Sequence, residues 1–252
     1  MATRSIGLTL AFGLTLLAST ASGNAFFGAN PQSGSLTFTG FSNGSVGAVI
    51  TSGGFSGVLV GQLQGFFDPA AEADGAGYES DDFLRFFCID INQPADTGAN
   101  PYTRSIGVPD ATNAEQLARL FELYYPNETS ATYYTGGPTD FGSFADANSS
   151  AAFQLAVWEI WFDNDMNLST GSFTASSAAA GLAQSYLDAV NAGSGTPEGW
   201  TFFTFTSPDK QDYLSAEYSV PLRTAPEPGT LILLCSAVLA AWATALHRRQ
   251  TA

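Results

Sequence analysis

The sequence predicts an α+β fold: an antiparallel β-sandwich or barrel with a helical insertion, between an N-terminal signal peptide and a C-terminal single transmembrane helix. Three observations predict this fold. Residues 33–67 alternate apolar and small polar positions, with Gly and Asn-Gly between the runs, which is typical of short antiparallel strands. Residues 83–91 form an aromatic and β-branched run that favours a strand. Between this strand and further strand-like runs near residue 200, apolar residues recur at helical spacing.

The expected strands fall into an N-terminal group, one strong strand after an acidic loop, and two strands near the end of the domain. Several short strands fill residues 33–67, and an acidic loop rich in Gly and Ala follows to residue 82. The strand over residues 83–91 reads Phe-Leu-Arg-Phe-Phe-Cys-Ile-Asp-Ile. Residues 200–206 and 213–220 are expected to be the closing strands.

Three helices are expected between these strands. Thr112 and Glu115 have capping-box spacing, and Pro126 ends the first helix. Its apolar face is predicted to carry Leu117, Leu120, Leu123 and Tyr124. The second helix is expected from Asn148 or Ser149 through Trp161, with one stripe formed by Phe153, Val157, Ile160 and Trp161. An Ala-rich third helix is expected from Thr174 to Asn191, before Gly193.

The first 25 residues are predicted to be a secretory signal peptide. Arg4 supplies the positive start, an apolar run follows from Ile6 to Ala18, and small residues precede a cleavage site after Gly23 or Ala25. A buried N-terminal helix is the alternative. The prediction is therefore that the secretion machinery exports the protein across the inner membrane.

The other end of the chain, residues 223–252, carries three features in series. Pro226, Glu227 and Pro228 precede an uncharged, mostly apolar stretch over residues 230–246, and a basic cluster follows it. About 17 residues is the lower limit for a membrane-spanning helix, and the basic cluster should stay cytoplasmic. This combination resembles the PEP-CTERM sorting tail of Gram-negative surface proteins. The resemblance implies that an exosortase recognises the Pro-Glu-Pro motif and that the anchor is temporary; a plain C-terminal membrane helix is the alternative.

The composition of the remaining domain, residues 26–222, excludes several function classes. Residues 26–227 contain five basic residues and all 23 acidic ones, which gives a formal charge near −18 that disfavours nucleic acid and anionic lipid as partners. The only histidine is His247, so Ser-His and Cys-His nucleophiles and His-based zinc sites are absent from the domain. We therefore expect no enzyme, no catalytic residue, no cofactor and no metal. A hydrolytic pair such as Asp81 and Asp82 is the weakest alternative.

One acidic segment resembles the start of a calcium loop. It reads Asp163-Asn164-Asp165-Met166-Asn167, but Leu168 stands where the loop needs Gly, and Thr174 where a bidentate Glu closes the shell. A solvated loop after the second helix is therefore the expectation here, and calcium binding is the alternative.

Cys88 is the only sulfhydryl expected in the mature domain, because Cys235 lies in the tail helix. Three elements in order surround it: Phe87-Cys88-Ile89-Asp90 in a strand, the Leu117-x-x-Leu120-x-x-Leu123-Tyr124 helix, and Gln154-Leu155-Ala156-Val157-Trp158. Over residues 83–162 this order resembles the thioester domain of Gram-positive surface adhesins. In that family a Thr precedes the Gln, and here Phe153 stands in its place.

The resemblance implies an internal thioester between Cys88 and Gln154, with Phe87, Asp90, Ala156 and Trp158 around it. Leu155, Val157, Trp158 and Trp161 are candidates for its apolar shield. The chain would then be a cell-surface adhesin that acylates a nucleophile on an extracellular polysaccharide or protein. The alternative is an inert core cysteine in a non-covalent structural component of the extracellular matrix or biofilm.

Overall fold

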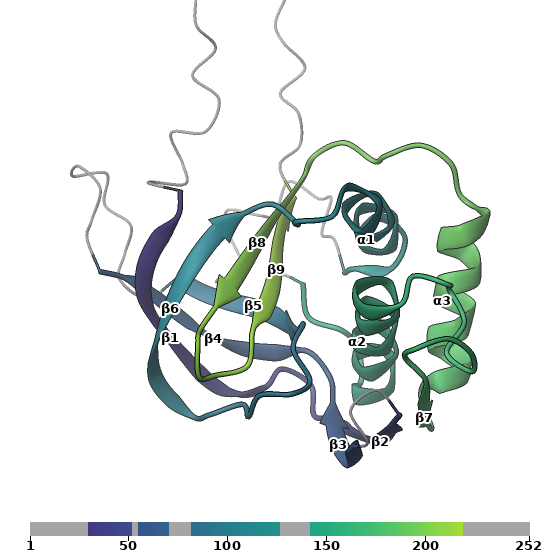
Figure 1. Ribbon diagram of the computed structural model, residues 1–252, viewed down its shortest axis with the longest axis horizontal. Coiled ribbons are helices and arrows are strands. Elements are labelled where there is room, and N and C mark those ends of the chain that lie inside the picture. The colour runs from purple at the N-terminus through teal and green to yellow at the C-terminus, as the bar shows by residue number, and fades with distance from the viewer. Residues whose placement is uncertain (1–29, 52–54, 71–81, 127–141, 219–252) are drawn as a thin grey trace, which may run out of the picture.

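The computed structural model describes residues 30–51, 55–70, 82–126 and 142–218 (Figure 1). The predicted signal peptide, the Pro-Glu-Pro motif and the predicted transmembrane stretch over residues 230–246 lie outside the described residues. Within the described residues, no helix is both long enough and apolar enough to cross a bilayer.

Six strands form a closed barrel, so the barrel alternative is correct and the sandwich is not. Its strands run in the order β1-β4-β5-β9-β8-β6, and each neighbouring pair is antiparallel. Their bounds are Gln32–Phe41 for β1, Leu63–Pro69 for β4, Asp82–Cys88 for β5, Gly98–Ile106 for β6, Trp200–Thr206 for β8 and Tyr213–Tyr218 for β9. Closure leaves no open edge on which another chain can add.

A second, three-stranded sheet lies beside the barrel. It contains β2 (Val46–Ile50) in the middle, flanked by β3 (Phe55–Val60) and β7 (Ala175–Ser177). β7 falls in the segment predicted as the start of the third helix, so that prediction was wrong there. The three residues of β7 extend because β2 offers them a ladder, as in the pairing of Ala48 with Ser177.

Three helices are inserted between β6 and β8, as the sequence predicts, and they pack together on one side of the barrel (Figure 1). They are α1 (Ala111–Tyr124), α2 (Ala147–Phe162) and α3 (Ala180–Ala192). α2 contacts both other helices, and every residue from Ser150 to Ile160 is buried. A helix that is apolar on all sides is stable only when it is surrounded, and this position surrounds it.

The helix caps differ from the expected ones. Asp110, not Thr112, caps α1 by accepting from the backbone N–H groups of Thr112 and Asn113. Asp146 caps α2 by accepting from the backbone N–H of Ser149. The helix therefore begins at Ala147, one to two residues earlier than expected. In both cases a carboxylate satisfies the unpaired N–H groups of the first turn, which a hydroxyl two or three residues later cannot reach.

The buried face of α1 also differs by one position. Leu117 and Leu120 are fully buried as predicted, but Leu123 is 52% exposed and Phe121 is buried instead. Phe121 packs edge-to-face against Phe87, Phe153 and Phe202. Because α1 packs against α2 and α3 and also meets rings of β5 and β8, the tertiary contacts decide which of several apolar residues faces the core.

Candidate functional site

Cys88 is the last residue of β5, at the end of the barrel that faces the helices. It pairs with Tyr213 of β9, and its side chain is 4% exposed. The predicted strand continued to Ile91, but β5 ends at Cys88, and one more backbone hydrogen bond to the β9 side follows, from the Ile89 N–H to the Asp212 oxygen. The sulfur therefore stands at the junction of barrel and helices.

Gln154 of α2 binds the main chain of Cys88 through both ends of its carboxamide. The Cys88 N–H donates to Gln154 Oε1, and Gln154 Nε2 donates to the Cys88 carbonyl oxygen, each at 2.8 Å. β4 pairs with β5 only as far as Phe86, so the side-chain amide occupies the place where a strand would continue the ladder. With Gln154 itself 1% exposed, this contact fixes the helix against the strand end.

The Cys88 thiol is held neutral. Burial is the main cause that raises its pKa well above the ordinary value, and the nearby Asp90 and Asp212 charges act in the same direction. The thiol donates to the main-chain oxygen of Asp90 at 3.1 Å. The Trp158 indole N–H is close enough to lower this pKa slightly, but it has no hydrogen-bond partner of ordinary geometry among the described residues.

Phe153, which stands where the adhesin motif has Thr, belongs to an aromatic cluster below the thiol. Its ring centroid lies 4.8 Å from that of Phe87, 4.9 Å from Phe121 and 5.1 Å from Phe144. The hydrogen bonds between Gln154 and Cys88 involve no side chain at position 153. The aromatic residue therefore serves packing, and the carboxamide is oriented without it.

A cavity of about 550 Å³ has Cys88, Gln154 and Trp158 in its wall. Most of the remaining wall is apolar and comes from distant segments, including Phe38 and Phe41 of β1 and Leu59 of β3. Leu59 is 59% exposed, so the cavity reaches the surface near β3. A ligand that enters it would meet the thiol and the carboxamide together.

The structure brings most of the sequence-predicted site residues together. Phe87 packs against Phe153, the neighbour of Gln154 in the chain, Asp90 contacts the thiol through its main chain, and Trp158 lines the cavity. Ala156 is buried, but it contributes to neither the cavity wall nor the hydrogen bonds of the pair. Of the four proposed shield residues, only Trp158 lines the cavity; the others are Leu155, Val157 and Trp161.

Sequence reasoning missed several contributors to the site. Gln211, from the turn between β8 and β9, donates to the Asp90 main-chain oxygen at 2.8 Å and lines the cavity. Phe38 and Phe41 also were not predicted to be near Cys88. No local pattern marks them, since they reach the site only through the pairing of strands that are distant in sequence.

Comparisons with known proteins give a weak likeness to a solved structure. No family model and no curated protein matches the chain. Among solved structures, it is similar to the N-terminal domain of the Streptococcus pyogenes pilus tip adhesin Cpa. The identity is 14% and the TM-score 0.33, over 62% of this chain and 85% of that one. A likeness of this strength leaves the function to be argued from the site itself.

Proposed function

We propose that this chain is an exported surface protein of the adhesin type, whose Cys88 and Gln154 form an internal thioester for covalent attachment. The observation that carries the proposal is the pair of 2.8 Å hydrogen bonds that hold the Gln154 carboxamide on the main chain of Cys88. The two reacting groups come from elements 66 residues apart in sequence and share one cavity wall.

Proximity is the main contribution that the fold makes to this reaction. An amide is a poor electrophile, so a thiol attacks it only when the two are held together and other motions are restricted. The sulfur adds to the Gln154 carbonyl carbon, the C–N bond breaks, and ammonia leaves. The proton lost by the thiol goes to the departing nitrogen, so the overall reaction needs neither a resting thiolate nor a histidine.

The Trp158 indole is suited to assist this step. Its N–H is buried and has no ordinary partner among the described residues, and leaving such a group unpaired is costly. The sulfur and the oxyanion that develops on Gln154 are both acceptors in the same cavity wall. We assign Trp158 a positioning role beside the reacting atoms.

Capture of a target is then a second acyl transfer. A lysine amine or a hydroxyl on an extracellular protein or polysaccharide attacks the thioester carbonyl, forms an amide or ester with Gln154, and releases the Cys88 thiol. The reaction happens once per molecule, so the protein is not an enzyme. In this proposal the secretion machinery exports the chain, and an exosortase removes the transient inner-membrane anchor at Pro226, Glu227 and Pro228.

The intact mass of the processed protein, purified from the cell surface, tests the proposal, with its two ends identified by peptide mapping. The thioester form should be lighter than the sequence mass of that processed chain by one ammonia, and methylamine should raise it by one methylamine. Peptide mapping should place the methylamide at position 154. Cys88→Ala is the matched control and should keep the sequence mass under both conditions. Sequence mass together with a free Cys88 thiol in freshly prepared wild-type protein would refute the thioester.

A second candidate function has its own supporting observation. The Gln154 amide is already satisfied by two main-chain groups, and Cys88 is buried, which is the pattern of an inert structural contact. The chain would then be a non-covalent component of the extracellular matrix or biofilm. In that case Cys88→Ala leaves surface attachment unchanged, whereas the thioester proposal requires attachment to be lost.

A further inference from the structure

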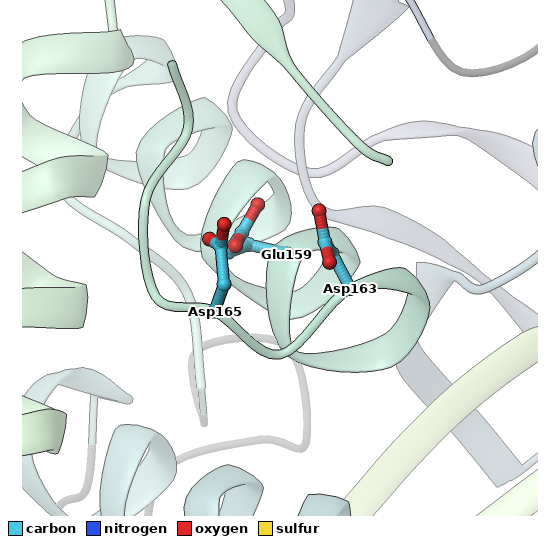
Figure 2. Close-up of side chains that lie close together, drawn as sticks. All are labelled: Glu159, Asp163 and Asp165. Atoms are coloured by element: carbon cyan, nitrogen blue, oxygen red, sulfur yellow. The ribbon is translucent and has the colours of Figure 1, made fainter. Parts of the chain in front are cut away.

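Three carboxylates converge where α2 ends. Glu159 lies in the last turn of the helix, Asp163 caps its C-terminus, and Asp165 follows in the loop. One oxygen from each lies within 4.8 Å of the other two, and Figure 2 shows the three side chains gathered at the loop. No basic side chain of the described residues forms an ion pair with any of them.

Glu159 makes this cluster different from an exposed acidic loop. Its side chain is fully buried, and its Oε2 has no hydrogen-bond partner among the described residues. Its Oε1 accepts a hydrogen bond from the Asn167 N–H, and Asp165 Oδ1 accepts from the same N–H. This shared donor holds the two carboxylates together. A buried carboxylate oxygen without a donor, facing a second carboxylate, is a costly arrangement unless a cation lies between them.

The surrounding loop orients the other two carboxylates. Asp163 Oδ2 accepts from the Ser172 and Phe173 N–H groups, and no described residue donates to Oδ1. Asp165 Oδ2 accepts from the Thr170 hydroxyl at 3.0 Å. The loop is thus fixed by its own hydrogen bonds, with one oxygen of Asp163 still available.

We propose that Glu159, Asp163 and Asp165 bind one calcium ion at the C-terminal end of α2. All three ligands are carboxylate oxygens, the donors of a hard cation, and nitrogen or sulfur donors for zinc or copper are absent from the cluster. Oxygens around one calcium ion at about 2.3–2.6 Å can be up to roughly 5 Å apart, which matches the observed cluster. Magnesium requires a smaller, near-octahedral shell.

The ion would join the helix that carries Gln154 to the loop that leads into β7. Burial first, and then the neighbouring Asp165 and Asp163, raise the pKa of Glu159 to about 8. A proton shared between Glu159 and Asp165 is therefore the competing explanation for the pair. The two explanations differ in one measurable property, because only a bound calcium ion makes the stability of the fold depend on the calcium concentration.

Thermal unfolding of the EGTA-treated full chain in mild detergent tests the proposal. Calcium at about a hundred times its Kd should raise Tm by roughly 5–10 °C, and magnesium at the same concentration should do much less. Glu159→Gln should weaken calcium binding at least tenfold, while Asp209→Asn, which removes an exposed acid elsewhere, should not. The absence of a calcium response in wild type, or an equal response in wild type and Glu159→Gln, overturns the proposal.

Terbium luminescence locates the ion without changing a ligand. Terbium replaces calcium and emits when a nearby tryptophan is excited, and Trp158 and Trp161 lie on either side of Glu159 in the chain. Replacing both Trp158 and Trp161 with Phe should remove most of this emission, whereas Trp200→Phe, on β8, should leave it. Emission that depends on Trp200 and survives the loss of both Trp158 and Trp161 would place the ion elsewhere and refute the assignment.

Discussion

Replacing Gln154 with alanine should destabilise the fold strongly, for a reason independent of any thioester. The substitution removes two 2.8 Å hydrogen bonds and leaves the N–H and C=O of Cys88 buried without these partners. Each unsatisfied main-chain group costs about 1–3 kcal/mol, and the lost methylene adds about 0.8 kcal/mol. Because the cavity beside the pair can admit water, we expect a loss of about 4 kcal/mol and not the upper limit.

The measurement is urea unfolding in a Cys88→Ala background, in which no acyl bond can form. Comparing Cys88→Ala with Cys88→Ala/Gln154→Ala then isolates the amide contact. Gln184→Ala is the matched control, because Gln184 likewise accepts from one main-chain N–H, that of Leu168, and donates to the Met166 carbonyl. That site is only part-buried, so water should replace the amide and the loss should stay near 1 kcal/mol.

A loss below about 1 kcal/mol for Gln154→Ala would refute this reasoning. It would mean that the Cys88 main-chain groups find other partners once the amide is gone. An equal loss for Gln154→Ala and Gln184→Ala would refute the role assigned to burial.

Three further predictions concern α2 and the residues around it. Phe153→Thr should lose about 3 kcal/mol in urea unfolding, because it empties part of the aromatic cluster beside Phe87; an unchanged stability would contradict that packing. Asp146→Ala should flatten the acid limb of a profile of unfolding free energy against pH. Hydrogen bonds from Ser149 lower the pKa of Asp146 in the folded state. The contribution of Asp146 to stability is therefore present above the unfolded pKa near 3.8 and is lost as pH falls through the lower folded pKa. A wild-type acid limb in this variant would refute the cap. Trp158→Phe should reduce the fraction of ammonia-depleted protein by intact mass, measured on protein that urea unfolding shows to be folded, and an unchanged fraction would remove Trp158 from the reaction.

The local patterns of the sequence predicted most of the helices and strands, and a resemblance predicted one contact between distant residues. Strand β5, the inserted helices and the closing strands follow from short-range periodicity, which the chain carries within ten to fifteen residues. The expectation that Cys88 and Gln154 meet came from a resemblance in motif order, and the structure places them in contact. The signal peptide and the sorting tail stay predictions from the sequence.

The tertiary structure decided what depends on contacts between distant segments. The side-by-side pairing of β1, β4, β5 and β9 brings Phe38 and Gln211 to the cavity, and the partner strand β2 extends β7 where a helix was expected. The burial of Phe121 in place of Leu123 depends on the elements that surround α1. The sequence marked Asp163 and Asp165 as acidic neighbours, but only the fold buries Glu159 beside them with an unpaired oxygen. Periodicity shows which residues share one face of a helix or strand. Which of these residues are buried, and which residues they contact, is decided only when the faces of different elements pack together.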